Sequence, residues 1–489
     1  MNVSDALRAG ATVLVRRPAT VLPFYLLGLG VNAAARVPLL VAGALAVAHL
    51  ARLGRLDPLV RAVRELDPAA IDPDGPGGAP PTPPPELRAA VEGLATPTAV
   101  GLLAVGTALA VVVWLVLRSV AAAGTLHAVH AFVRDRDPAT IGVAGIGADW
   151  RTFLGLQLLR GAILGTVLAT VALLPGVAGL LAALLALLVV PAVLLALAFA
   201  GQAVVVDRTG VTGAVRRSLA VPVRRPGGFL AYLVVVVSCW SLAFVGLGVL
   251  AAVGAPQAGA LVLALVVPPV VDAFKTALYA EGRLPVHRGT PPVLGGLRSG
   301  LWALGRFVRE HPLAVLAAAV VLLASGGAGY AGALELGTRL PLPSDPAGGL
   351  ESLGAGGFVN IAANNWLVAA GTAFGGLAFG VPTIAALAFN GALVGAIAGV
   401  VDPRAFLALV GPHAVLELPA IAIAGGLGVH LAGVGWRGLR GRLSPREAGA
   451  ELTFAFRVLV GLAVVFAAAA AVEAFLTPRI AARVLAVRL

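Results

Sequence analysis

The sequence predicts an all-α, polytopic integral membrane protein with about eleven transmembrane helices and several short interfacial amphipathic helices. Three observations support this fold class. Of the 489 residues, 59% are hydrophobic and 12% are charged, whereas a soluble domain carries about a quarter charged residues. Uncharged runs long enough to cross about 30 Å of hydrocarbon as a helix recur along the whole chain. The short segments of alternating polarity that build a membrane β-barrel are not visible.

The apolar runs give the positions of the predicted membrane helices. These are the ranges 19–51, 97–133, 153–175, 177–206, 227–253, 257–280, 312–334, 358–380, 382–401, 404–434 and 452–476. The first, second and tenth are longer than one crossing needs. We therefore expect them to be tilted, kinked at Pro38 or Pro419, or extended beyond the membrane. The N-terminal residues lack a signal-peptide pattern, so the first span is expected to stay as an uncleaved anchor.

Charge and cysteine content argue against a nucleic-acid partner and against cysteine-based sites. The formal net charge of +12 comes almost entirely from arginine, with Lys275 as the only lysine. These arginines gather at the ends of apolar runs, as in cytoplasmic loops that contact anionic headgroups. The basicity therefore indicates membrane topology, and no nucleic-acid partner is expected. Cys239 is the only cysteine, which excludes a disulfide framework and a cysteine metal cluster.

Basic segments also set the predicted orientation. They are Arg16–Arg17 and the ranges 208–225, 283–309 and 437–446. All four fall on one side in an eleven-span count, and the positive-inside rule makes that side the cytoplasm. We therefore expect a multi-pass protein of the cell membrane with a cytoplasmic N-terminus. The same count places the tail 479–488, with its three arginines, on the opposite side, against the rule.

One unit recurs three times along the sequence. An amphipathic stretch ends in basic residues and is followed by Pro18, Pro226 or Pro312, where an apolar span begins. Each stretch predicts a short helix on the cytoplasmic interface that ends before the proline. The proline then starts the membrane helix, where its missing N–H costs nothing. The expected interfacial anchors are Arg16, Arg17, Arg216, Arg217, Arg224, Arg225 and Arg309, and specific binding of lipid headgroups is the alternative.

Composition also suggests a division of the chain. The loop 67–96 contains a proline-rich run at 75–85, which predicts a semi-rigid extracytoplasmic linker. A second Pro/Gly-rich loop at 335–357 is expected on the same side. The amphipathic unit restarts after the basic linker 281–297. We therefore predict an N-terminal six-helix membrane module over 1–290 and a second membrane module over 291–489.

Polar side chains gather within 358–478, in an otherwise very apolar part of the chain. The candidate site residues are Asn364, Asn365, Asn390, His413, Glu417 and Glu473. Polar groups are costly in hydrocarbon unless they face a partner or water, so we expect the asparagines, His413 and Glu417 to point into a shared interior. Glu473 is expected to find its partner on another helix or at the far interface, near Thr477–Pro478.

The His413–Glu417 pair leaves several chemistries open. Residues four apart share one helix face, so the pair suits an imidazole–carboxylate contact, a proton relay or two ligands of a metal. Two ligands are too few to specify a metal, and no metal or cofactor is predicted. A structural clasp between helices is an equally good interpretation. The glycines expected to allow close helix packing are Gly371, Gly375, Gly391, Gly395 and Gly399.

No enzyme signature is present: the chain lacks a Gly-rich phosphate loop, a His-Glu-x-x-His motif and a nucleophile elbow. We therefore expect no catalytic residue, and an intramembrane enzyme that uses His413 and Glu417 is the least favoured interpretation.

The order of the polar motifs resembles the stage II sporulation protein M family over about 300–489. The motifs are Asn364–Asn365, Asn390–Gly391, Pro412–His413 with Glu417–Leu418, and Glu473 with Thr477–Pro478. Ala414 stands where the family's Pro-His-Gly-x-x-Glu element has glycine. The first 290 residues more faintly resemble the membrane domain found with glycerophosphodiester phosphodiesterases, through the segment 203–219 and Arg224–Arg225–Pro226. That domain is not the catalytic part of those enzymes.

The resemblance implies a role as a non-catalytic membrane scaffold. The family's namesake is a membrane partner that recruits cell-wall-degrading enzymes, so we expect a protein that organises partners in envelope or membrane remodelling. The expected partners are the lipid bilayer and membrane or envelope proteins. The alternative function is a transporter or channel that uses the intramembrane Asn/His/Glu cluster as its site.

Overall fold

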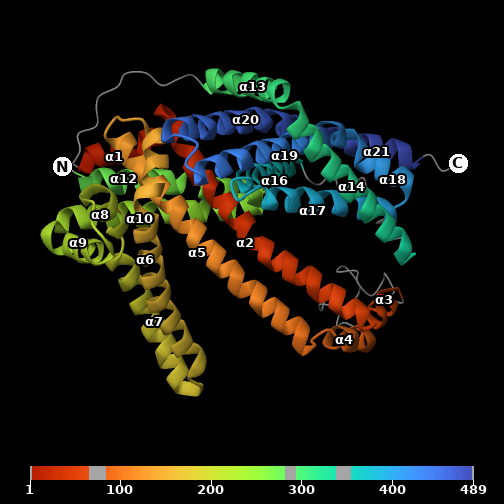
Figure 1. The fold of residues 1–489 in the computed structure, drawn as a ribbon, viewed down its shortest axis with the longest axis horizontal. Helices are drawn as coiled ribbons and strands as arrows, with labels where there is room; N and C mark the ends of the chain where they lie inside the picture. Colours follow the sequence, from red (N-terminus) through yellow and green to blue (C-terminus); the bar gives the residue numbers. More distant parts are fainter. Residues whose placement is uncertain (1–2, 65–83, 281–292, 338–353, 487–489) are drawn as a thin grey trace. The chain divides into compact units, whose positions relative to one another are not determined.

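The computed structural model describes residues 3–64, 84–280, 293–337 and 354–486. The described residues are helical and contain no strand (Figure 1). The proline-rich run at 75–85, the basic linker 281–297 and the loop 335–357 lie wholly or largely outside them. Two short helices, α3 (Asp57–Arg64) and α4 (Pro85–Glu92), flank the proline-rich run.

Ten helical runs of the described chain are long and apolar enough to cross a membrane. The first six are α2 (Pro18–Arg52), α5 (Pro97–Val133), α6 (Pro138–Leu173), α7 (Gly176–Ala196) with α8 (Ala200–Asp207), α10 (Pro226–Ala252), and α11 (Pro256–Leu265) with α12 (Val267–Ala280). The others are α14 (Pro312–Leu336), α17 (Val381–Val400), α19 (Gly411–Leu439) and α20 (Pro445–Ala471) with the residues that follow it. The chain is therefore an all-α, polytopic membrane protein, which confirms the predicted fold class.

The eighth predicted span differs from the other ten. It forms helix α16 (Gly354–Gly375), but α16 is not among the ten sufficiently apolar runs. Three amides, Asn360, Asn364 and Asn365, lie within this helix, and they lower its hydropathy. Helix α16 packs against α17, and the hydroxyl of Thr383 donates a hydrogen bond to the carbonyl of Thr372 over 2.7 Å.

The recurring amphipathic unit forms the predicted helix–proline–helix arrangement at all three sites. Helices α1 (Val3–Arg16), α9 (Val211–Arg224) and α13 (Val293–Glu310) each precede a membrane helix that starts at proline. Arg225 and His311 interrupt the helix with φ/ψ of −140°/58° and −128°/46°. The pre-proline residue is displaced from the α region because its backbone clashes with the proline ring. Neither Pro38 nor Pro419 divides its helix.

The sequence predicted that the last membrane helix ends at 476, just before Pro478, and that boundary is wrong. A π-helical turn, η2 (Val472–Leu476), follows α20, and α21 (Thr477–Ala486) continues directly from it. The Thr477 hydroxyl donates to the carbonyl of Val472 over 3.1 Å, five residues back. A π turn inserts one extra residue into the helix. It therefore lets the chain pass a proline that cannot donate the usual backbone bond.

Contacts divide the chain into two compact units, each assembled from separate stretches of sequence. Unit 1 consists of Met1–Val31, Leu115–Gly305 and Val434–Gly461, and unit 2 of Asn32–Trp114, Arg306–Gly433 and Leu462–Leu489. These units are defined by contacts in space, whereas the modules 1–290 and 291–489 were inferred from sequence. The division into sequence modules stays a prediction.

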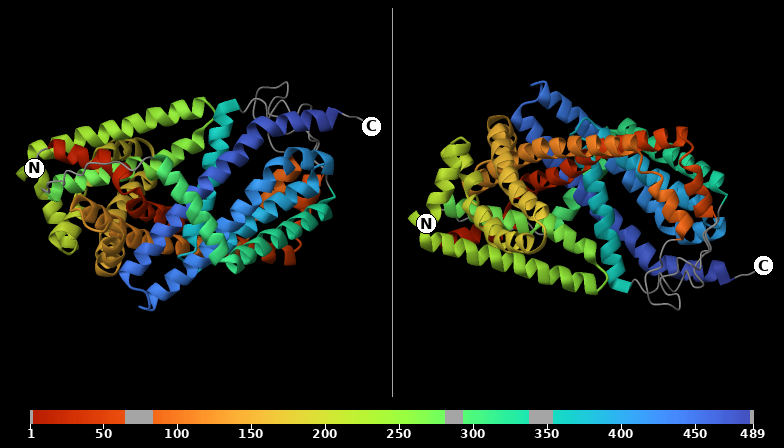
Figure 2. Two further views of the ribbon diagram at one scale, coloured as in Figure 1. Left: turned by 90° about the horizontal axis from the view of Figure 1, so that it is seen from above. Right: turned by 90° about the horizontal axis from the view of Figure 1, so that it is seen from below.

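Unit 1 packs α1 onto α12. Ala6, Ala9 and Val13 of α1 share an apolar core with Phe274 and Ala277 of α12. The spacing of the α1 residues matches one face of a helix, which explains why the amphipathic stretch folds back onto the protein. Helix α10 runs beside α11 and α12, as Figure 2 shows, and α6 pairs with α7.

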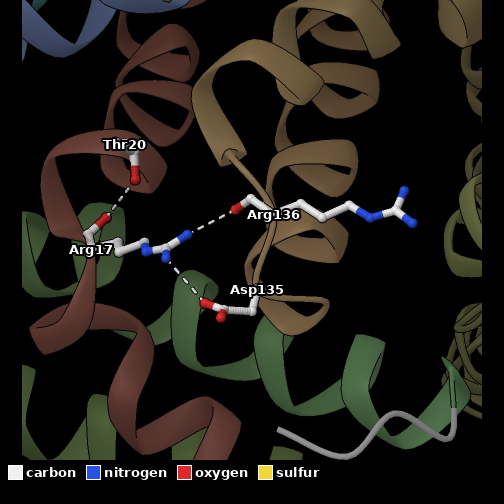
Figure 3. A network of polar contacts seen from close by, with 4 residues as sticks. All are labelled: Arg17, Thr20, Asp135 and Arg136. Atoms are coloured by element: carbon white, nitrogen blue, oxygen red, sulfur yellow. Dashed lines mark hydrogen bonds and ion pairs between the residues drawn. The ribbon is translucent and has the colours of Figure 1, made fainter. Parts of the chain in front are cut away.

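Arg17 connects two helix junctions in unit 1 (Figure 3). Its guanidinium donates to the carbonyl of Arg136 over 2.8 Å and to a carboxylate oxygen of Asp135 over 3.0 Å. The hydroxyl of Thr20 donates to the carbonyl of Arg17 over 3.1 Å. The junction between α1 and α2 is thereby held against the loop that joins α5 to α6.

Unit 2 contains a helix pair with its backbones in contact. A Cβ added to Gly391 or Gly395 of α17 would overlap the carbonyl oxygen of Leu322 or Gly326 of α14. At Gly399, an added Cβ would lie 2.6 Å from the Cβ of Ala333. Glycine at this spacing lets two membrane helices approach more closely than any side chain allows.

Candidate functional site

The candidate site is formed by the start of α19 and the π turn after α20, both in unit 2. His413 and Glu417 lie in the first two turns of α19, which begins after a break at Val410. The break separates α19 from α18 (Pro403–Leu409), whereas the sequence predicted one continuous span at 404–434. Glu473 lies within the π turn. Single π turns inside α-helices often occur at functional sites.

His413 lies between the two carboxylates. Its Nε2 is 4.0 Å from Oε2 of Glu417 and 3.9 Å from Oε2 of Glu473. Three potential ligand atoms, one from each side chain, lie within 4.8 Å of one another. The structure therefore places Glu473 close to the pair selected from sequence, although it lies on a different helical segment.

These separations are too long for direct hydrogen bonds. An N–H···O bond in a protein has its heavy atoms about 2.9 Å apart, and a contact of about 3.6 Å is no longer one. A structural clasp would bring the imidazole into contact with at least one carboxylate. By contrast, His127 and Asp149 of unit 1 are 2.8 Å apart. The three side chains at the candidate site lie close together without a direct hydrogen bond from His413 to either glutamate.

The charge of the site is unbalanced. Among the described residues, neither Glu417 nor Glu473 has an arginine or lysine partner within ion-pair distance. The Nδ1 atom of His413 is buried and has no hydrogen-bond partner in the described chain. The side chains of His413, Glu417 and Glu473 are 12%, 21% and 22% exposed. Two carboxylates at this depth require a proton or a cation to offset their charge.

The three asparagines take part in other contacts. The side-chain amide of Asn364 donates to the side-chain oxygen of Asn365 over 3.3 Å, on the exposed face of α16. Asn390 donates to the carbonyl of Ala386 in its own helix over 2.7 Å. The contacts of these residues thus do not link them to His413, and a common interior for all five stays a prediction.

The glycines selected from sequence differ in their surroundings. Gly391, Gly395 and Gly399 face the backbone of α14, as described above. At Gly375 a Cβ would lie 3.0 Å from that of Pro382. An added Cβ on Gly371 would meet nothing within 4 Å, so this position has no close helix approach.

The interfacial arginines divide into two groups. Arg17, Arg217 and Arg225 contact the protein itself: Arg217 lies 2.6 Å from Asp207, and Arg225 donates to the carbonyl of Tyr279 over 3.2 Å. Arg216, Arg224 and Arg309 are exposed and Arg16 is half-buried, and none of these four makes such a contact with another described residue. Anchoring to headgroups stays a prediction for this second group.

A second polar cluster, in unit 1, was missed by the sequence analysis. The Tyr25 hydroxyl donates to Asp272 over 3.1 Å, and Asp272 interacts electrostatically with Lys275 and Arg118. Lys275 is also repelled by the positive charge of Arg160, whose Nε is buried without a hydrogen-bond partner in the described chain. The available signal was the ionisable residues within apolar runs, which are functional candidates by default.

Comparison with known proteins gave a match over part of the chain. A search of curated proteins and a search of solved structures each gave no match. The resemblance of the N-terminal half to the membrane domain of glycerophosphodiester phosphodiesterases is not supported. Residues 314–478 match the family model described as Stage II sporulation protein M. This segment contains His413, Glu417 and Glu473, and we conclude that the candidate site lies in a Stage II sporulation protein M-like membrane region.

Proposed function

We propose that this chain is a non-catalytic integral membrane scaffold that organises partner proteins in envelope or membrane remodelling. The proposal places it in the cell membrane with its N-terminus in the cytoplasm, because the basic segments share one side in the eleven-span count. The match of residues 314–478 to Stage II sporulation protein M supports a membrane role for this region. The geometry of α14 supports the scaffold role in particular.

Helix α14 has two different faces. Its inner face meets α17 backbone to backbone through glycine. Its outer face carries exposed apolar side chains along the whole helix: Leu313, Leu316, Val320, Leu323, Tyr330 and Leu334. These residues follow the three-and-four spacing that helices use to pack along a narrow seam. A helix fixed on one side with a regular apolar seam on the other is suited to present a constant surface to a partner helix in the bilayer.

Site-specific photo-cross-linking in native membranes tests this proposal. A photoreactive amino acid is placed at Leu316 or Leu323 on the outer face of α14, and at Leu188 of α7 as an equally apolar, exposed control outside the matched segment. A scaffold predicts a discrete protein adduct from both α14 positions and only lipid adducts from Leu188. Lipid adducts alone from all three positions would contradict it.

A transporter or channel is the second candidate, and the cluster of His413, Glu417 and Glu473 favours it. Ionisable side chains inside a membrane often mark ion or proton pathways. This function predicts cation or proton uptake by proteoliposomes that contain the protein, and loss of uptake in Glu473→Gln with normal protein abundance. If the proteoliposomes take up the cation or proton and the α14 positions give only lipid adducts, the transporter function replaces the scaffold proposal.

A further inference from the structure

We infer that His413, Glu417 and Glu473 form a binding site for a divalent transition-metal ion, for which Zn²⁺ is the probe. This inference does not depend on the scaffold role, since it concerns only what the three side chains bind. It follows from the donor set, the geometry and the charge of the site.

The donor set suits a transition metal. Imidazole nitrogen and carboxylate oxygen are both ligands of Zn²⁺, whereas Ca²⁺ and Mg²⁺ prefer oxygen alone. Three protein ligands with a water molecule would complete a four-coordinate site, and neither Glu417 nor Glu473 is fully buried. The sequence showed only the i, i+4 pair on α19. The third ligand comes from a π turn sixty positions further along the chain, as the residue numbers 413 and 473 show.

The geometry needs only small side-chain movements. Ligands about 2.1 Å from a tetrahedral ion are about 3.4 Å apart, and Nε2 of His413 lies 4.0 and 3.9 Å from the two carboxylates. Rotation of two glutamate side chains closes this difference without a backbone change. No hydrogen bond has to be broken, because His413 makes none with either glutamate and its Nδ1 has no partner among the described residues.

The charge also favours a cation over an empty site. Two ionised carboxylates beside a neutral imidazole would carry two negative charges, and no arginine or lysine of the described residues lies within ion-pair distance of them. A divalent ion offsets both charges at once. Protonation of both glutamates is the competing way to neutralise the site, and metal-binding measurements separate the two.

The test uses the purified full-length chain, free of any affinity tag, in detergent or nanodiscs after treatment with a chelator. Zn²⁺ binding is measured by isothermal titration and by metal content after dialysis. We expect about one Zn²⁺ per chain. Loss of an outer hydrogen-bond partner of a metal ligand weakens metal binding by a factor of about 10–100. Glu417→Gln and Glu473→Gln each remove a ligand itself, so each should weaken Zn²⁺ binding by at least this factor.

Asp149→Asn is the matched control, because Asp149 also pairs with a histidine but at 2.8 Å, in direct contact. It should bind Zn²⁺ as the wild type does. The wild type should also melt at a higher temperature with Zn²⁺ than without it, since a ligand of the folded state stabilises that state. The thermal shift of the wild type can be measured even if a variant fails to fold. Any of three results would overturn the inference. The wild type would bind no more Zn²⁺ than Glu473→Gln, the melting temperature of the wild type would not rise with Zn²⁺, or Asp149→Asn would lose as much Zn²⁺ binding as the glutamate variants.

Discussion

At the scale of single residues, the most consequential feature of unit 1 is a carboxylate among cations. Asp272 accepts a hydrogen bond from Tyr25 and interacts electrostatically with Lys275 and Arg118. Arg160 adds a further positive charge, which acts on Lys275. Burying charges is unfavourable unless they are paired. Asp272 is the carboxylate that offsets this group of cations.

We predict that Asp272→Asn destabilises the protein strongly. The substitution keeps the size of the side chain and removes the only negative charge of the cluster, which leaves the cations unpaired. Removal of one partner of a buried, contacting ion pair costs about 3–5 kcal/mol. Asp272 and Lys275 are half-buried, and Asp272 acts on the cations without a direct ion pair among the described residues, so this range is the upper bound of the expected loss. The measurement is the midpoint of thermal unfolding of the purified protein, together with its abundance in membranes.

Asp5→Asn is the control for this substitution. Asp5 pairs with Arg8 at 3.4 Å, and the arginine side chain is 59% exposed. Exposed pairs of this kind contribute about 0–1 kcal/mol, so little change is expected. Equal melting temperatures for the two variants would show that Asp272 does not hold the cations in place.

At the scale of secondary-structure elements, glycine determines how α14 and α17 pack. The two helices touch where Gly391 and Gly395 face carbonyl groups of α14. At Gly395 the nearest opposing atoms all belong to the backbone of Gly326, so a side chain there has no flexible neighbour to displace. At Gly391 the carbonyl oxygen of Leu322 lies beside the hydroxyl of Ser325. The distance between the helices is therefore set by the absence of side chains.

We predict that Gly395→Ala separates α14 from α17 and lowers stability by at least about 1–3 kcal/mol, the usual cost of overpacking. Gly327→Ala, on α14, is the matched control because a Cβ there would meet nothing within 4 Å. Alanine is the better helix former by up to about 1 kcal/mol, so the control should be neutral or slightly stabilising. Thermal unfolding and the yield of monodisperse protein measure both variants. A loss of equal size in Gly327→Ala would argue against the backbone contact.

Several elements could be predicted from sequence because their signals are local. Pro18, Pro226 and Pro312 mark the starts of membrane helices, since proline is tolerated only in the first turn of a helix without disruption. The apolar runs show the remaining spans because each exceeds the membrane thickness. The extension of α6 back to Pro138 also has a local signal, the Asp137 side chain that caps it.

The arrangement of the candidate site could be predicted only in part. The spacing of His413 and Glu417 showed that they share a helix face, but the approach of Glu473 depends on a tertiary contact. The break at Val410 and the π turn at 472–476 follow from packing rather than from a residue pattern. Pro478 was misleading, because the π turn lets the helix continue past it.

At the scale of the whole molecule, one contact bears on the number of crossings. A Cβ on Gly449, near the start of α20, would lie 2.7 Å from the backbone of Ala139 at the start of α6. The loop just before Ala139 holds Arg17. The start of α20 and the start of α2 therefore lie at the same end of unit 1.

This shared end requires an even number of crossings between Arg17 and α20. Nine of the ten sufficiently apolar runs begin before α20, and nine is odd. Helix α16 is the remaining candidate, and its 22 residues correspond to about 33 Å at 1.5 Å per residue. We therefore predict that α16 crosses the membrane despite its asparagines. The molecule then has eleven crossings, and its tail lies opposite its N-terminus.

Cysteine labelling tests this eleven-crossing topology, the central claim about the whole molecule, most directly. In a Cys239→Ala background, single cysteines are placed at Ser4, at Arg442 between α19 and α20, and after Leu489, and a membrane-impermeant thiol reagent is applied to each side. We predict that the cysteines at 4 and 442 are labelled from the same side and the one after 489 from the other. Labelling of 4 and 442 from opposite sides, or of both ends of the chain from one side, would contradict the eleven-crossing topology.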